Sequence, residues 1–159
     1  MQALLTIFGI VLAAFCLVIF VGAPYLPALR PQIQAAFDLL DLPKGATILE
    51  LGSGDGKVLL AAAEAGYQAV GIELNPLLVL VSWLRTRRYR GQVTIIWGNF
   101  WRVQWPPSDG VFTFLLDRFM PKLDEQMRAY RQPLASVTFR VPERRVVAEK
   151  DGVFLYDYR

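Results

Sequence analysis

Residues 50–56 read Glu-Leu-Gly-Ser-Gly-Asp-Gly, a glycine-rich turn between two stretches of different character. Residues 46–49 before it are typical of a short buried strand, and residues 57–65 after it are strong helix formers that end at Gly66. Because glycine has no Cβ, such a turn lets the backbone come very close to a bound ligand. The turn therefore predicts a site for a nucleoside-containing cofactor.

The spacing of the glycines narrows the class of cofactor. Dinucleotide-binding folds carry G-x-G-x-x-G, whereas Gly52, Gly54 and Gly56 form G-x-G-x-G. The next predicted strand, residues 68–72, ends at Glu73, seventeen residues after Gly56. An acid at that strand end is well placed to accept hydrogen bonds from both ribose hydroxyls.

These motifs resemble a known family. Residues 50–56, followed by Gly-Ile-Glu-Leu-Asn-Pro at 71–76, look like motifs I and II of the seven-strand, S-adenosylmethionine-dependent methyltransferases. Asn-Phe-Trp-Arg-Val at 99–103 and an apolar N-terminal segment that ends in Tyr25-Leu26-Pro27 are similar to a membrane-anchored lysine methyltransferase family. The mitochondrial members of that family modify the ATP synthase c-subunit and the adenine nucleotide translocase. The resemblance implies a Rossmann-like class I methyltransferase sheet with S-adenosyl-L-methionine as cofactor.

The resemblance also implies which residues bind the cofactor. Glu50 is a charged residue at the end of a buried strand, which is costly unless it is satisfied, and it would help to hold the cofactor's amino group. Glu73 would bind the ribose. Asn99 stands where the family usually has Asp, and its side-chain oxygen would accept from the adenine amino group. The full predicted set is Glu50, Gly52, Ser53, Gly54, Gly56, Glu73, Leu74, Asn75, Asn99, Phe100 and Trp101.

Two aromatic residues of that set have a second interpretation. Phe100 and Trp101 either sandwich the adenine ring or belong to the core, as aromatic pairs at strand ends often do.

Asp117 is the candidate for the methyl acceptor's side of the site. It follows a predicted strand where the family builds its acceptor pocket, so it would orient the amine of a lysine; a helix-capping role is the alternative. Residues 115–118 read Leu-Leu-Asp-Arg and lack the Asn/Asp-Pro-Pro-aromatic motif typical of methyltransferases that act on nucleic-acid bases. The net charge of +3 is modest. We therefore expect no nucleic-acid partner.

Metal and thiol chemistry is not expected. The chain has no histidine, which removes the commonest general base and metal ligand, and Cys16 is its only cysteine.

The N-terminal segment predicts a membrane anchor. The chain has 159 residues, 54% of them hydrophobic, and residues 3–23 carry no charge. As a helix that run would rise about 31 Å, close to the hydrocarbon thickness of a bilayer. A cleaved signal peptide is the alternative, but only Met1 and Gln2 precede the run, so a basic n-region is missing. Because the first positive charge, Arg30, follows the run, we expect a single-pass protein with its catalytic domain on the cytoplasmic side.

The remainder of the chain alternates between strand and helix, as a doubly wound parallel sheet does. Asn75-Pro76 predicts the start of a helix, with Asn as its N-cap. Residues 145–149 and 153–158 predict a hairpin that turns at Asp151-Gly152, without the long helix that usually separates strands five and six. Further strands are expected at 93–97, 111–116 and 136–141, and further helices at 31–42, 77–89 and 121–131.

Three domains are expected: an anchor at 1–30, a linker helix at 31–45 and a trimmed methyltransferase domain at 46–159. The linker helix either packs on the sheet or forms a lid over the cofactor site.

A basic cluster follows an apolar run in one of these helices. Arg85, Arg87, Arg88 and Arg90 lie beside Trp83. The cluster is a solvated helix end, where cations are favourable, an RNA-binding patch, or a contact with anionic lipid headgroups.

The sequence thus predicts a membrane-anchored, S-adenosylmethionine-dependent methyltransferase, with a membrane protein's lysine as acceptor. One alternative acceptor is a lipid-soluble small molecule such as a quinone or an isoprenoid. Another alternative is a non-catalytic module that binds the cofactor at the membrane.

Overall fold

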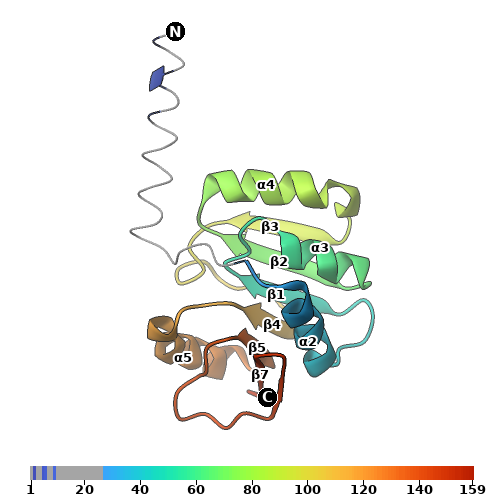
Figure 1. Cartoon of the computed structure of the whole chain (residues 1–159), viewed down its shortest axis with the longest axis vertical. Coiled ribbons are helices and arrows are strands. Elements are labelled where there is room, and N and C mark those ends of the chain that lie inside the picture. The colour runs from blue at the N-terminus through green and yellow to red at the C-terminus, as the bar shows by residue number, and fades with distance from the viewer. Residues whose placement is uncertain (1, 3–4, 7–8, 10–26) are drawn as a thin grey trace.

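A computed structural model describes residues 2, 5, 6, 9 and 27–159. Its strands are β1 (Thr47–Leu51), β2 (Gln68–Glu73), β3 (Val93–Trp97), β4 (Gly110–Thr113), β5 (Leu134–Val137), β6 (Ala148–Lys150) and β7 (Val153–Tyr156). They form one seven-stranded sheet in the order β3-β2-β1-β4-β5-β7-β6 (Figure 1). Strands β1 to β5 are parallel, whereas β7 runs antiparallel to both β5 and β6.

Helices pack on the sheet, and all but the first lie on connections between parallel strands. They are α2 (Arg30–Leu40), α3 (Lys57–Glu64), α4 (Pro76–Thr86) and α5 (Met120–Tyr130), with the short 3-10 helices η1 (Arg87–Tyr89) and η2 (Asp117–Phe119). Strand order reverses between β1 and β4, so the loops at their carboxyl ends diverge. In open α/β sheets, ligands bind at such a switch point.

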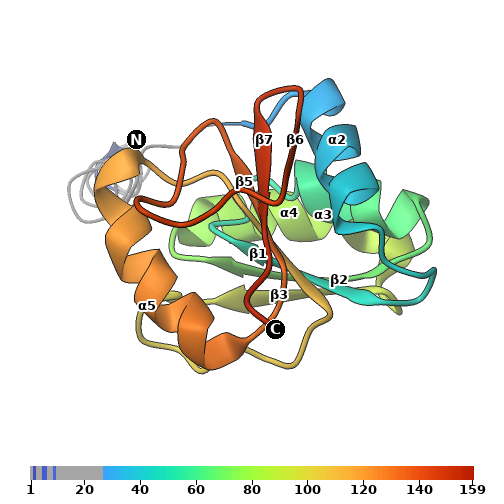
Figure 2. The same ribbon diagram turned by 90° about the horizontal axis from the view of Figure 1, so that it is seen from below.

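The core has two layers because side chains alternate across the sheet. On one face, Ile48 of β1 packs with apolar side chains of α2 and α3. On the other, Leu49 and Leu51 of the same strand pack against α5. Figure 2 shows α5 apart from α2 and α3.

Several predicted elements are confirmed. The side-chain oxygen of Asn75 caps α4 by accepting from the Leu77 backbone N–H at 3.0 Å. The C-terminal hairpin turns at Asp151 and Gly152, both with positive φ, as a two-residue turn that matches the strand twist requires. None of residues 138–147, all of which the structure describes, is helical, so the sheet has the predicted trimmed C-terminal half.

Several strands were predicted with wrong boundaries. The first strand of the hairpin was expected at 145–149 but spans Ala148–Lys150. The fifth strand was expected at 136–141 but spans Leu134–Val137. Thr138 has a φ of 68°, and the Ser136 hydroxyl donates to the Phe139 carbonyl, so the chain leaves the sheet there. The fourth strand was expected at 111–116 but ends at Thr113.

Helix α2 is a packing element of the sheet. Its apolar face, with Ile33, Phe37 and Leu40, is buried in the core, and α2 packs against β5 and β7. The packing interpretation of this helix is therefore the correct one.

The predicted anchor, residues 3–23, falls almost entirely outside the residues that the structure describes. Within the described part, no helix has the length and apolar character needed to cross a membrane.

Candidate active site

The glycine-rich turn between β1 and α3 adopts a backbone that other residues rarely reach. Gly52, Gly54 and Gly56 have φ values of 78°, 53° and 77°, in the left-handed region that glycine enters without steric cost. A Cβ on Gly56 would lie 2.2 Å from the Ser82 hydroxyl oxygen of α4, whereas one on Gly52 would meet only Phe100, at 4.0 Å. Gly56 thus permits close packing of α4, while Gly52 leaves its surroundings open.

The Glu73 carboxylate at the end of β2 holds two loops together. Oε2 accepts from the Gly54 backbone N–H at 2.8 Å, and Oε1 accepts from the Asn75 backbone N–H at 2.7 Å. The residue is 8% exposed. Each carboxylate oxygen can accept more than one hydrogen bond, so Glu73 retains capacity for a ligand hydroxyl at this edge.

Glu50, in β1, is a buried acid whose carboxyl group lacks a full set of hydrogen-bond donors among the described residues. Its residue is 5% exposed, and among the described residues none donates a hydrogen bond to Oε2. Burial raises the pKa of the Glu50 carboxyl well above its ordinary value, and the negative charges of Glu73 and Asp55 raise it further. A cationic ligand would relieve both penalties.

The other predicted residues of the β2–α4 and β3–β4 loops lie at the same edge. The Leu74 carbonyl accepts from the Trp97 indole N–H at 3.0 Å. The side-chain oxygen of Asn99 accepts from the Trp101 backbone N–H at 2.9 Å. Asn99 therefore already supports its own loop, and only its remaining lone pair is available to an adenine amino group.

An aromatic cluster joins the β3–β4 loop to η2. The ring centroids of Phe100 and Trp101 are 4.5 Å apart, and those of Trp101 and Phe119 are 6.1 Å apart. Phe100 and Trp101 are half-buried against the core. These rings therefore pack against the core, whereas the adenine contact stays a prediction, with Phe100 facing Gly52.

The acceptor candidate Asp117 is exposed and begins η2. The residues at the N-cap positions of η2 and α5 are Leu116 and Phe119, so Asp117 is not a helix cap. Nearby in sequence, the Lys122 ammonium lies 4.6 Å from the centroid of the Trp101 ring. The face of Trp101 thus already carries an amine cation.

Sequence reasoning missed several features of this edge. It did not find Lys122 over Trp101, because contacts between distant residues leave no local pattern. It also missed the buried hydroxyls of Ser82 and Thr113, which have no hydrogen-bond partner among the described residues. Of the basic cluster, Arg85 pairs with Asp55 of the glycine-rich turn, a contact that the cluster's position in sequence does not reveal.

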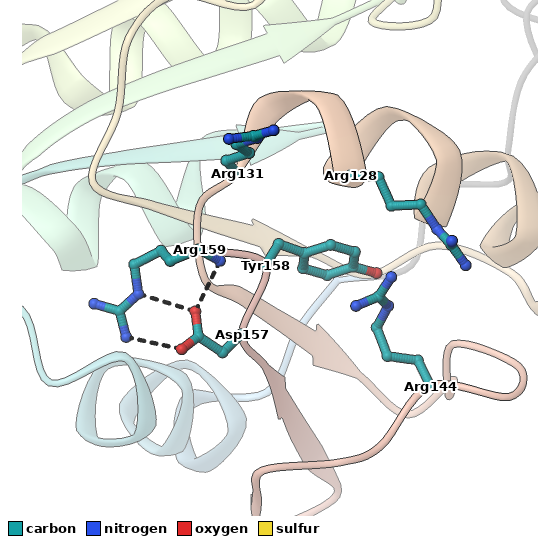
Figure 3. Close-up of a pocket in the computed structure, with 6 residues that line it drawn as sticks. All are labelled: Arg128, Arg131, Arg144, Asp157, Tyr158 and Arg159. Carbon is teal, nitrogen blue, oxygen red and sulfur yellow. Dashed lines mark hydrogen bonds and ion pairs between the residues drawn. The ribbon is translucent and has the colours of Figure 1, made fainter.

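A separate hollow of about 350 Å³ lies beside α5 and the C-terminal residues (Figure 3). The Asp124 carboxylate accepts hydrogen bonds from Arg144, Arg128 and Tyr158 next to it. Arg131 and Arg159 of its lining follow α5 and β7, which both end at the amino edge of the parallel strands. The hollow is therefore distinct from the glycine-rich edge. It is lined by Arg128, Arg131, Arg144, Asp157, Tyr158 and Arg159.

Residues 50–148 match the family model described as the ANTKMT methyltransferase domain. The chain is 34% identical over 116 residues to the ATP synthase c-subunit lysine N-methyltransferase of Xenopus laevis, covering 72% of this chain and 51% of the relative. It is 31% identical over 109 residues to the adenine nucleotide translocase lysine N-methyltransferase of Mus musculus, covering 67% and 47%. The chain thus spans about half the length of the curated relatives it matches.

Solved structures share the fold. An RNA methyltransferase from Salinibacter ruber, in complex with S-adenosyl-L-homocysteine, superposes with a TM-score of 0.75 at 23% identity, covering 82% of this chain and 91% of that chain. A SAM-dependent methyltransferase from Thiobacillus denitrificans, with the same ligand, gives a TM-score of 0.58 at 21% identity and covers 70% and 49%. At these identities the likeness establishes the fold alone.

Proposed function

The chain belongs to the ANTKMT methyltransferase domain family, and we propose that it is an S-adenosylmethionine-dependent methyltransferase that modifies lysine on a membrane protein. The named relatives are lysine N-methyltransferases. The site residues described above support the same activity in this chain.

The observation that carries the proposal is the buried, incompletely paired carboxyl of Glu50. It lies where the charges of Glu73 and Asp55 already oppose its ionisation, so this edge favours a positively charged ligand over an anionic one. When bound, S-adenosylmethionine supplies an electrophilic methyl group on a sulfonium, together with an ammonium group. The pyrophosphate of a dinucleotide would be repelled by the carboxylates of Glu50, Glu73 and Asp55. This agrees with the glycine spacing, which differs from the G-x-G-x-x-G of dinucleotide-binding folds.

The other residues of the edge have roles that suit such a ligand. The left-handed backbone of Gly52 leaves room for close approach, and Glu73 would accept from ribose hydroxyls while it holds the Gly54 loop. Phe100 faces the same space. An in-line transfer requires mainly that the donor and acceptor be aligned, and these residues would position the donor.

The aromatic cluster of Phe100, Trp101 and Phe119 would form the acceptor side of the site. The Trp101 ring carries the Lys122 ammonium, and an incoming lysine would be attracted to the same ring once it takes the place of Lys122. A lysine amine must lose its proton before it can accept a methyl group. Desolvation beside a cationic sulfonium lowers its pKa without a dedicated base, and exposed Asp117 would orient the amine from the rim.

The membrane part of the proposal comes from the sequence. Residues 3–23 would anchor the chain as a single span, with the catalytic domain on the cytoplasmic side. This arrangement would bring the active site close to lysines at the membrane surface.

The test supplies methyl-labelled S-adenosylmethionine to membranes with and without the protein. Label in protein that maps to lysine by mass spectrometry supports the proposal. Label confined to the lipid extract would instead indicate a quinone or isoprenoid acceptor, and label in RNA would indicate a nucleic-acid acceptor. No label, together with cofactor binding by calorimetry, would indicate the non-catalytic module.

A further inference from the structure

Helix α4 buries small polar residues and exposes large apolar ones, the reverse of an ordinary surface helix. Its buried residues are Ser82 and Thr86, while Leu80, Val81, Trp83 and Leu84 are 53%, 42%, 46% and 47% exposed. A helix that covers a sheet normally turns its apolar stripe inward. Position 82 requires a small residue because Gly56 of the glycine-rich turn packs directly against it and leaves no room for a larger side chain.

Three of the exposed side chains, Leu80, Val81 and Leu84, form a continuous stripe that the half-buried Leu77 extends toward the start of the helix. Leu77, Leu80, Val81 and Leu84 follow the spacing i, i+3, i+4, i+7, which places them on one face of a helix. Figure 1 shows α4 on the outside of the molecule, beyond β2 and β3. A contiguous exposed apolar face of this kind marks an interaction surface rather than isolated surface residues.

The charged residues of α4 and of the segment that follows it are all basic. Residues 76–90 contain no acidic side chain. Arg85 is paired with Asp55, but Arg87 and Arg88 of η1 and Arg90, directly after it, are exposed. The Arg90 guanidinium also lies 4.7 Å from the centroid of the Trp83 ring, so an indole and a cation share one boundary.

We propose that this outward face of α4 lies in the headgroup region of an anionic bilayer, with the leucine stripe in the upper acyl layer and Arg87, Arg88 and Arg90 on lipid phosphates. An apolar stripe bordered by arginine and tryptophan has the composition of an interfacial helix, and each such cation is attracted to an anionic lipid surface. The proposal shares the membrane location with the proposed function but is independent of the methyl acceptor.

This docking would orient the active site. Helix α4 starts at Pro76, three residues after Glu73, and its eleven residues extend about 16 Å. With α4 flat on the bilayer, the carboxyl edge of the sheet lies within about one helix length of the headgroups. The fold would then be held at two places, at its N-terminal segment and along α4.

The test uses the full chain with Cys16→Ser in nanodiscs, spin-labelled at Leu84→Cys. The matched control is Val147→Cys. Val147 is 58% exposed and precedes β6, which is at the opposite edge of the sheet from β3, a strand that α4 contacts. Collisions with oxygen and with a water-soluble nickel chelate are compared in nanodiscs of phosphatidylcholine with and without phosphatidylglycerol. We expect a several-fold loss of nickel collisions at position 84 in the anionic nanodiscs, and none at position 147. Replacing Arg87, Arg88 and Arg90 with Glu should restore the nickel collisions at position 84.

Three results would overturn the proposal. Position 84 could be as open to nickel as position 147, or it could be protected equally in neutral discs. It could also be protected in lipid-free detergent solution, which would mean that protein covers the stripe. Methyl transfer is measured on the same samples, so a failure of docking with transfer intact leaves the proposed function standing.

Discussion

Oε2 of Glu73 and the backbone N–H of Gly54 are 2.8 Å apart, which ties the end of β2 to the glycine-rich turn after β1. The same carboxylate also accepts from the Asn75 N–H. One side chain therefore both shapes the loop and faces the proposed ribose position. Replacing Glu73 should disturb both roles.

Glu73→Ala should abolish or greatly weaken cofactor binding. Hydrogen bonds to a charged group are worth about 1.5–3 kcal/mol each, so the loss of one ligand contact alone corresponds to about 10–100-fold in Kd. Titration calorimetry with S-adenosylhomocysteine measures the change. Glu64→Ala, an exposed acid at the end of α3, is the control. Wild-type affinity in Glu73→Ala would overturn the ribose assignment.

Glu50→Gln should stabilise the ligand-free protein while it weakens cofactor binding. Because burial and the charges of Glu73 and Asp55 raise the pKa of Glu50 in the folded state above 4.5, the folded protein holds this proton more tightly than the unfolded chain. The contribution of Glu50 to the free energy of unfolding is therefore greatest below about pH 4.5 and falls as pH rises through the folded pKa. The glutamine variant should lack this fall and gain about 1–3 kcal/mol at neutral pH.

Urea denaturation of both proteins between pH 4 and pH 8 measures this slope. Binding of a cation should also release the Glu50 proton, which calorimetry in buffers of different ionisation enthalpy detects. Parallel pH profiles for the wild type and Glu50→Gln would contradict the assignment, as would unchanged cofactor affinity.

Asp124→Asn should destabilise the fold without affecting cofactor binding. Burial alone would raise the pKa of the Asp124 carboxyl, but hydrogen bonds from Arg144, Tyr158 and Arg128 outweigh it and hold the pKa below 3.8. The carboxylate thus adds stability above about pH 3.8, and this is lost as pH falls through the folded pKa. We expect a loss of about 1–3 kcal/mol at pH 7.

The matched control is Asp157→Asn, whose partner Arg159 is largely exposed. Its cost should stay within about 0.5 kcal/mol, because exposed ion pairs contribute little. If urea unfolding gave the same loss in free energy of unfolding for both variants, the Asp124 hydrogen bonds would stabilise the fold no more than an exposed ion pair does.

The sequence predicted those parts of the fold that local chemistry controls. The glycine-rich turn, the Asn75 cap and the Asp151-Gly152 hairpin each follow from residues whose own preferences suit the backbone geometry found there. The end of β5 escaped prediction because Thr138, a β-branched residue, adopts a φ of 68°. The outward leucines of α4 also escaped, because periodicity identifies an apolar face but not its direction. The close approach of Gly56 to Ser82 sets that direction, and it exists only in the folded chain.

The final prediction concerns the face of Trp101. If this ring attracts the acceptor amine as it attracts Lys122, Trp101→Leu should lower kcat/KM for the lysine acceptor by about 3–30-fold, the range of a cation–π contact. Trp101→Phe retains a weaker aromatic face and should fall between the leucine variant and the wild type. Steady-state rates with labelled donor measure this order, and S-adenosylhomocysteine affinity separates acceptor from donor effects. Equal rates for the phenylalanine and leucine variants would mean that the ring acts by packing against Phe100 and Phe119.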